Sequence, residues 1–156
     1  MKRIAIYHSP VGDMQLEYEN GAVTALKTVK AGVQLEGAPD ALAETVFRQL
    51  DEYFAGTRTA FDFPCVPQGT PFQQKVWAAL CEIPYGETRS YKQIAEAVGK
   101  PKACRAVGMA NNRNPIIIVI PCHRVIGANG ALTGYGGGLE MKRALLELEG
   151  AAYMEK

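Results

Sequence analysis

The sequence is poor in histidine, in paired cysteines and in long apolar runs, and each shortage excludes a class of protein. Its two histidines, His8 and His123, are too few for a histidine-rich metal site. Its four cysteines show no CxxC or other zinc-like spacing, so we expect no bound metal. The longest aliphatic run, Ile116 to Ile120, cannot span a bilayer, and the first residues are too polar for a signal peptide. We therefore expect a protein without a membrane partner, in the reducing cytoplasm.

The 156 residues suffice for one medium domain or two small ones, and their charge is unevenly distributed. Residues 1–68 carry 6 Lys and Arg against 9 Asp and Glu, whereas residues 69–156 carry 11 against 7. Residues 89–124 contain seven basic residues and a single acidic one, Glu96. Such a stretch fits a polyanionic partner, but a merely solvated basic face fits it equally well.

Residues 1–68 are expected to form a small domain with a supporting role. The expected elements are strands at 3–7 (alternating around Ile4 and Ile6), 14–18 and 23–29, a helix at 40–54 and a short strand at 61–63. Asn20-Gly21 is a strong hairpin signal between the second and third strands. Gly56 stands just past the helix, where a terminating glycine belongs. Pro64 and Pro67 then predict a linker.

Residues 69–156 are expected to form a second, mainly helical domain. Thr70-Pro71-Phe72-Gln73 is a capping box with proline at the first helical position, so a helix begins there. Two short helices follow, one from about Ser90 and one from Lys102 to Ala110. The break between them is typical of a helix-turn-helix, although many helical hairpins share it. A terminal helix ends at Glu149-Gly150.

The helix expected over residues 102–110 is unusually poor in large side chains. Three alanines and a glycine leave Arg105 as its main long side chain. A helix of this kind can approach a narrow surface closely, and the minor groove of DNA is only about 6 Å wide. Tight packing against a neighbouring helix is the alternative explanation.

The stretch from Asn114 to Val125 is the most informative part of the chain. Its β-branched apolar run predicts a buried extended segment that Pro121 stops. A thiol and an imidazole follow directly, at Cys122 and His123. A nucleophilic cysteine reacts as its thiolate, and a neighbouring base is one way to form it. The alternative is a buried structural cysteine next to a surface histidine.

This stretch also resembles a known family. Pro121-Cys122-His123-Arg124-Val125 is similar to the active-site signature of the O6-alkylguanine-DNA alkyltransferases, also called methylated-DNA–protein-cysteine methyltransferases. The surrounding order agrees over residues 70–150, with PFQQ-x-VW, SYKQIA, RAVG, NP, GYGGG and LLELEG. The resemblance implies an α+β fold. A small N-terminal ribonuclease-H-like α/β domain over residues 1–68 precedes a mainly helical, winged-helix-like domain over residues 69–156, which contains a helix-turn-helix.

The resemblance further implies direct DNA repair. The family moves an alkyl group from guanine O6 to its cysteine, here Cys122. The product is a thioether that water does not hydrolyse, so the chain is expected to act once and to need no cofactor. The expected partner is double-stranded DNA carrying O6-alkylguanine, bound through the minor groove by a monomer with its target base extruded.

Roles for other residues carry over by position. His123 matches the base that deprotonates the cysteine through a water, and Glu149 matches the carboxylate that orients it. Tyr91 matches the donor to guanine N3, Asn114 the residue that holds the active-site turn, and Arg105 the residue that enters the vacated stack. The expected pocket residues are Val125, Tyr135 and Gly136. The further DNA contacts expected are Ser90, Lys102, Ala106, Gly108, Arg113 and Arg124.

Two other functions compete with this interpretation. A DNA-binding regulator that recognises alkylated bases without repairing them would lack the cysteine, and Cys122 is present. A cysteine hydrolase or acyltransferase could use Cys122 and His123, but it leaves the basic stretch and the helix of small residues unexplained.

Overall fold

A computed structural model describes residues 2–29, 40–132 and 138–153. The chain divides into two units, Met1–Gln68 and Gly69–Lys156. The first unit combines a small sheet with one helix, and the second is mainly helical. The α+β class predicted from the sequence is therefore confirmed.

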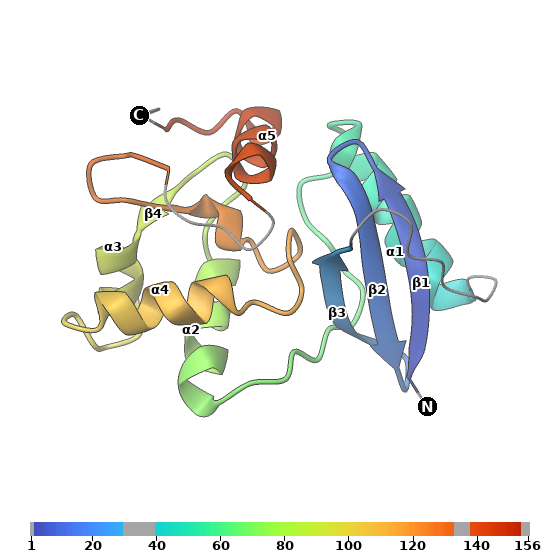
Figure 1. The fold of residues 1–156 in the computed structure, drawn as a ribbon, viewed down its shortest axis with the longest axis horizontal. Coiled ribbons are helices and arrows are strands. Elements are labelled where there is room, and N and C mark those ends of the chain that lie inside the picture. Colours follow the sequence, from blue (N-terminus) through green and yellow to red (C-terminus); the bar gives the residue numbers. More distant parts are fainter. Residues whose placement is uncertain (1, 30–39, 133–137, 154–156) are drawn as a thin grey trace. The chain divides into compact units, whose positions relative to one another are not determined.

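The first unit contains a three-stranded antiparallel sheet in the order β1-β2-β3 (Figure 1). Its strands are β1 (Arg3–Ser9), β2 (Gly12–Glu19) and β3 (Ala22–Thr28). The predicted hairpin turn joins β2 to β3, with φ of 52° at Asn20 and 77° at Gly21. Asparagine and glycine tolerate this left-handed backbone better than other residues, which is why the pair signals the turn.

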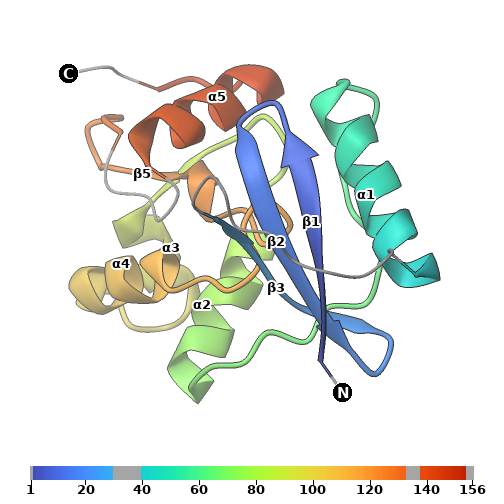
Figure 2. The same cartoon turned by 45° about the vertical axis from the view of Figure 1, so that its right-hand side comes forward.

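Helix α1 (Ala41–Phe54) lies beside the sheet, next to β1 (Figure 2). Its N-cap is Asp40, whose carboxylate accepts from the amides of Leu42 and Ala43 at 3.1 and 3.2 Å. Gly56 lies just past its end with φ of 81°, as predicted. The ring of Tyr7 packs 5.3 Å from that of Phe47, which ties β1 to the helix.

Two details of the first unit differ from the sequence prediction. The fully buried side chains of β1 are Ala5 and Tyr7, on the opposite face from Ile4 and Ile6, because Tyr7 packs its ring against α1. No strand forms over residues 61–63. The pairing occurs slightly later, where Val23 donates to Pro64 O at 2.9 Å and accepts from Val66 N at 2.8 Å.

The second unit begins with α2 (Pro71–Cys81), which has the predicted capping box at Thr70. Trp77 on this helix is buried, and its indole N–H donates to Ala110 O at 2.9 Å. The remaining elements, in chain order, are β4 (Arg89–Ser90), α3 (Tyr91–Ala97), α4 (Cys104–Asn112), the 3-10 helix η1 (Cys122–Arg124), β5 (Val125–Ile126) and α5 (Leu139–Glu149). Helices α2, α3 and α4 contact one another (Figure 1).

Helices α3 and α4 are joined by a short turn. Ser90 caps α3 through a second capping box with Gln93, and Gly99 continues the chain with φ of 79°. Helix α4 begins at Cys104, two residues later than predicted, because residues 101 and 102 form a turn after Lys100. Strands β4 and β5 pair in parallel, Arg89 with Val125 and Ser90 with Ile126.

Candidate active site

The segment before Cys122 is buried but not extended, so that part of the sequence prediction was wrong. Residues 116–120 wind into turns in which Ile120 N donates to Ile116 O at 3.0 Å, and Ile118 has φ of 72°. Asn114 closes these turns. Its Nδ2 donates to Ile120 O at 2.7 Å, and its Oδ1 accepts from Ile116 N at 2.9 Å. An amide can donate and accept at once, and this outweighs the β propensity of the isoleucines.

Cys122 is the first residue of η1, and its side chain is buried. Its amide donates to Ile120 O at 2.8 Å, and its carbonyl accepts from Nδ2 of Asn111 at 3.4 Å. None of the four cysteines forms a disulfide. Cys122 is the buried one, whereas Cys81 is exposed and Cys65 and Cys104 are half-buried.

His123 is fully buried and paired with a carboxylate. Its Nε2 lies 2.7 Å from Oε2 of Glu149 at the end of α5. Burial lowers the pKa of His123; the hydrogen bond to Glu149 opposes this effect, and the charges of Arg124 and Lys142 reinforce it. A neutral imidazole bonded to a carboxylate through Nε2–H presents a lone pair at Nδ1. The geometry therefore equips His123 to accept a proton.

Arg124 does not lie where a DNA contact would need it, and this corrects the sequence prediction. Its side chain is buried, with Nε and Nη2 donating to the two carboxylate oxygens of Glu149 at 2.8 and 3.1 Å. Nη1 donates to Ile83 O at 2.7 Å. The fork of donors that could grip a phosphate instead fixes the carboxylate that holds His123. The geometry of Arg124 is therefore suited to positioning that carboxylate.

Lys142 is a buried cation that sequence reasoning missed. The side chain, on α5, is fully buried, and Nζ donates to Val125 O at 2.6 Å. Burial lowers the pKa of Lys142 to about 8, while the charge of Cys122 acts in the opposite direction. An ammonium that a cysteine stabilises in turn stabilises the thiolate of that cysteine. The signal in the sequence was its spacing: Lys142, Leu146 and Glu149 share one side of α5, and all three are buried.

Tyr91 and the remaining predicted DNA contacts lie on or near α3 and α4. Tyr91 is half-buried at the start of α3, against Gly108, where an added Cβ would lie 3.8 Å from its ring. Ser90 accepts from Gln93 N as the N-cap of α3. The exposed predicted contacts are Lys102, Arg105, Ala106 and Arg113. Val125 is buried in β5, and Tyr135 and Gly136 lie outside the described residues.

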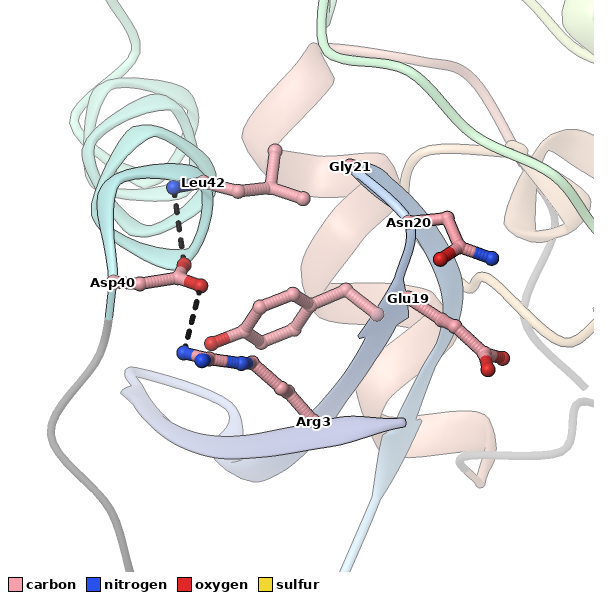
Figure 3. Close-up of a pocket in the computed structure, with 7 residues that line it drawn as sticks. Arg3, Glu19, Asn20, Gly21, Asp40 and Leu42 are labelled. Atoms are coloured by element: carbon pink, nitrogen blue, oxygen red, sulfur yellow. Dashed lines mark hydrogen bonds and ion pairs between the residues drawn. The ribbon is translucent and has the colours of Figure 1, made fainter. Parts of the chain in front are cut away.

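A pocket of about 240 Å³ lies in the first unit, and none of the predicted site residues lines it (Figure 3). Two of its three charged lining residues pair with each other, because Arg3 donates to Asp40 at 3.1 Å. Across residues 2–29, 40–132 and 138–153, no three His, Cys, Asp or Glu side chains gather as a metal site would need. The same residues contain no helix that is both long and apolar enough to cross a membrane.

Comparison with known proteins covers both units. Residues 71–151 match the family described as "6-O-methylguanine DNA methyltransferase, DNA binding domain", and residues 2–67 match its "ribonuclease-like domain". A methylated-DNA–protein-cysteine methyltransferase of Methanosarcina acetivorans is 51% identical over 153 residues, which is 94% of this chain and 97% of the relative. The constitutive one of Bacillus subtilis is 49% identical and covers 95% of each chain.

Solved structures agree with these sequence matches. The crystal structure of Mycobacterium tuberculosis O6-methylguanine methyltransferase has a TM-score of 0.88 and 48% identity, covering 96% of this chain and 93% of its own. A structure of Mycobacterium tuberculosis OGT in complex with DNA has a TM-score of 0.84 and 50% identity, covering 96% and 92%.

Proposed function

The chain belongs to the 6-O-methylguanine DNA methyltransferase family, and on that premise we propose that Cys122 is the residue that accepts the alkyl group. The protein repairs DNA by alkyl transfer to cysteine. The observation that carries the assignment of Cys122 is its surroundings: it is buried at the start of η1, and the next residue is an imidazole held 2.7 Å from Glu149. The buried ammonium of Lys142 donates to Val125 O, three residues further along the chain.

The proposed reaction is a displacement at carbon. The thiol proton passes to His123 through a water, and the thiolate lone pair attacks the alkyl carbon of O6-alkylguanine. A carbon–sulfur bond forms as the carbon–oxygen bond breaks, and the electron pair of that bond goes to guanine. The Tyr91 hydroxyl donates to guanine N3 and so stabilises the leaving group. The guanine anion takes up one proton and the His123 imidazolium returns one to solvent, so guanine and S-alkylated protein are the products.

The network around His123 supports its role as the base. Desolvation keeps the imidazole neutral before reaction, whereas the carboxylate of Glu149 stabilises the imidazolium that forms. Glu149 is itself held by both arms of the Arg124 guanidinium. The arrangement is a nucleophile, a base and an orienting carboxylate, with Arg124 as a fourth member.

The DNA-binding side of the proposal rests on α3 and α4 as a helix-turn-helix. Lys102, Arg105 and Arg113 are exposed on or beside α4, where they can neutralise phosphates. Ala106 is exposed between them and permits a close approach to the minor groove. The target atom lies inside a duplex, so the base is extruded, and Arg105 fills the vacated stack. We place the protein in the cytoplasm, as a monomer that inactivates itself.

The test is transfer from a duplex containing a single O6-methylguanine, followed by mass analysis of the protein's peptides. One methyl group per chain is expected, on the peptide containing Cys122, with no further product when substrate is in excess. Cys122→Ser should bind the duplex and transfer nothing, because a hydroxyl lacks a thiolate's nucleophilicity. Cys81→Ser is the matched control and should remain active. A methyl group found on another cysteine, or release of more than one equivalent of guanine, would contradict the proposal.

A further inference from the structure

Two buried polar atoms beside Cys122 have no hydrogen-bond partner among the described residues. They are Nδ1 of His123 and Oδ1 of Asn111, whose residues are 0% and 1% exposed. Buried polar side-chain atoms are satisfied in the great majority of cases, by protein or by ordered water. Both residues adjoin the nucleophile, one by sequence and one by the bond from its Nδ2 to Cys122 O.

Both atoms are hydrogen-bond acceptors, as the partner of the other polar atom in each side chain shows. Nδ2 of Asn111 faces a carbonyl and must be the amino group, so Oδ1 is the acceptor. Nε2 of His123 faces a carboxylate oxygen and carries the hydrogen, so Nδ1 is also an acceptor. Two acceptors cannot bond each other, but one water molecule has two hydrogens to donate.

We propose that Asn111 is a positioning residue for deprotonation of Cys122, because its Oδ1 and Nδ1 of His123 together hold the water that relays the thiol proton. The inference deepens the proposed function and rests on it. The water accepts the proton from Sγ and passes one of its own to Nδ1. The electron pair of the S–H bond stays on sulfur as thiolate, and the water is regenerated.

Asn111 fixes the direction of this transfer. A water held by Nδ1 alone could rotate, whereas a second acceptor orients both of its hydrogens and leaves its lone pairs for the thiol. The charged groups that act on the imidazole are Glu149 and Lys142 from α5 and Arg124 from η1. Asn111, in the last turn of α4, adds an uncharged acceptor to these charged groups.

The experiment follows the reaction of Cys122 with iodoacetamide against pH, which needs no DNA, with peptide mass analysis to separate Cys122 from the other thiols. Asn111→Leu removes the acceptor, and also the 3.4 Å bond from Nδ2 to Cys122 O, in a side chain of similar size. In this variant the midpoint of the pH dependence of the Cys122 reaction should move to higher pH. The reaction rate at pH 7 should be about tenfold lower than in wild type, as expected for the loss of one hydrogen bond. Asn112→Leu, one residue further and exposed, is the matched control and should match wild type.

Asn111→Asp guards against a merely structural effect. It keeps an acceptor oxygen but adds a negative charge beside the thiol, so its midpoint should rise further than that of Asn111→Leu. At a pH above all midpoints the three proteins should react at similar rates, which a disturbed fold would not permit. Unchanged midpoints in both variants would overturn the role of Asn111. Wild-type protein that reacts normally here but accepts no methyl group from DNA would overturn the proposed function instead.

Discussion

Replacing Lys142 by methionine should make the protein more stable at neutral pH and less reactive. Lys142 is fully buried, and its pKa is lowered to about 8 from an ordinary 10.5. The folded state therefore binds this proton more weakly than the unfolded state does. The cost to stability is fully present below pH 8 and disappears as pH rises toward 10.5. Methionine fills a similar volume and carries no such cost.

The magnitude follows from the two pKa values. They differ by about 2.5, which at 1.36 kcal/mol for each unit corresponds to about 3 kcal/mol. Methionine loses the hydrogen bond from Nζ to Val125 O, worth about 1 kcal/mol. Lys142→Met should thus be more stable than wild type by about 2 kcal/mol at pH 7 and less stable by about 1 kcal/mol near pH 10.5.

Urea unfolding at the two pH values measures this difference, with the fluorescence of Trp77, the sole tryptophan, reporting on the unit that contains Lys142. Lys75→Met removes an exposed lysine and is the matched control, with little change at either pH. The reaction of Cys122 with iodoacetamide at pH 7 should slow in Lys142→Met, because the thiolate loses its neighbouring cation. A variant less stable than wild type by the same amount at both pH values would refute the reasoning.

Two further substitutions test the network. Arg124→Met should destabilise the fold by about 3–5 kcal/mol in thermal or urea unfolding, because it leaves the Glu149 carboxylate buried without its cation. At a temperature where the variant is folded, its affinity for undamaged duplex and the salt dependence of that affinity should equal those of wild type. A loss of affinity there would support the predicted DNA contact of Arg124. Asn114→Ala should lower the free energy of unfolding by about 2 kcal/mol, since it removes both hydrogen bonds that close the turns before Cys122. The folded variant should also react more slowly with an alkylating reagent at Cys122. An unchanged stability would show that the turns form without Asn114.

The parts of the fold that follow local rules could be predicted from the sequence. The capping box at Thr70 marks the start of α2, and Gly56 marks the end of α1, because a few adjacent residues determine these features. The Asn20-Gly21 hairpin is local in the same sense. The pairing of His123 with Glu149, 26 residues apart, came from family resemblance rather than from any local pattern.

Features that depend on particular side-chain hydrogen bonds, or on contacts between segments far apart in the sequence, could not be predicted from residue propensities. The isoleucines of residues 116–120 favour a strand by propensity, but the two bonds of Asn114 impose turns instead. The basic character of Arg124 suggested DNA, yet its partners are a carboxylate on α5 and a carbonyl after α2, which the chain brings together only on folding. The Oδ1 atom of Asn111 stands out only once burial is known.

The short parallel ladder of β4 and β5 has a thermodynamic consequence. Ser90 ends β4 and caps α3, while Val125 begins β5 directly after η1, so two residue pairs join the proposed DNA-reading helices to the nucleophile. We predict that two sites joined in this way are coupled, and any such coupling is reciprocal. The factor by which bound DNA favours the thiolate of Cys122 over the thiol equals the factor by which the thiolate raises the affinity for DNA. We therefore predict that alkylation, which removes the thiolate, also removes that share of the affinity and favours release of the duplex.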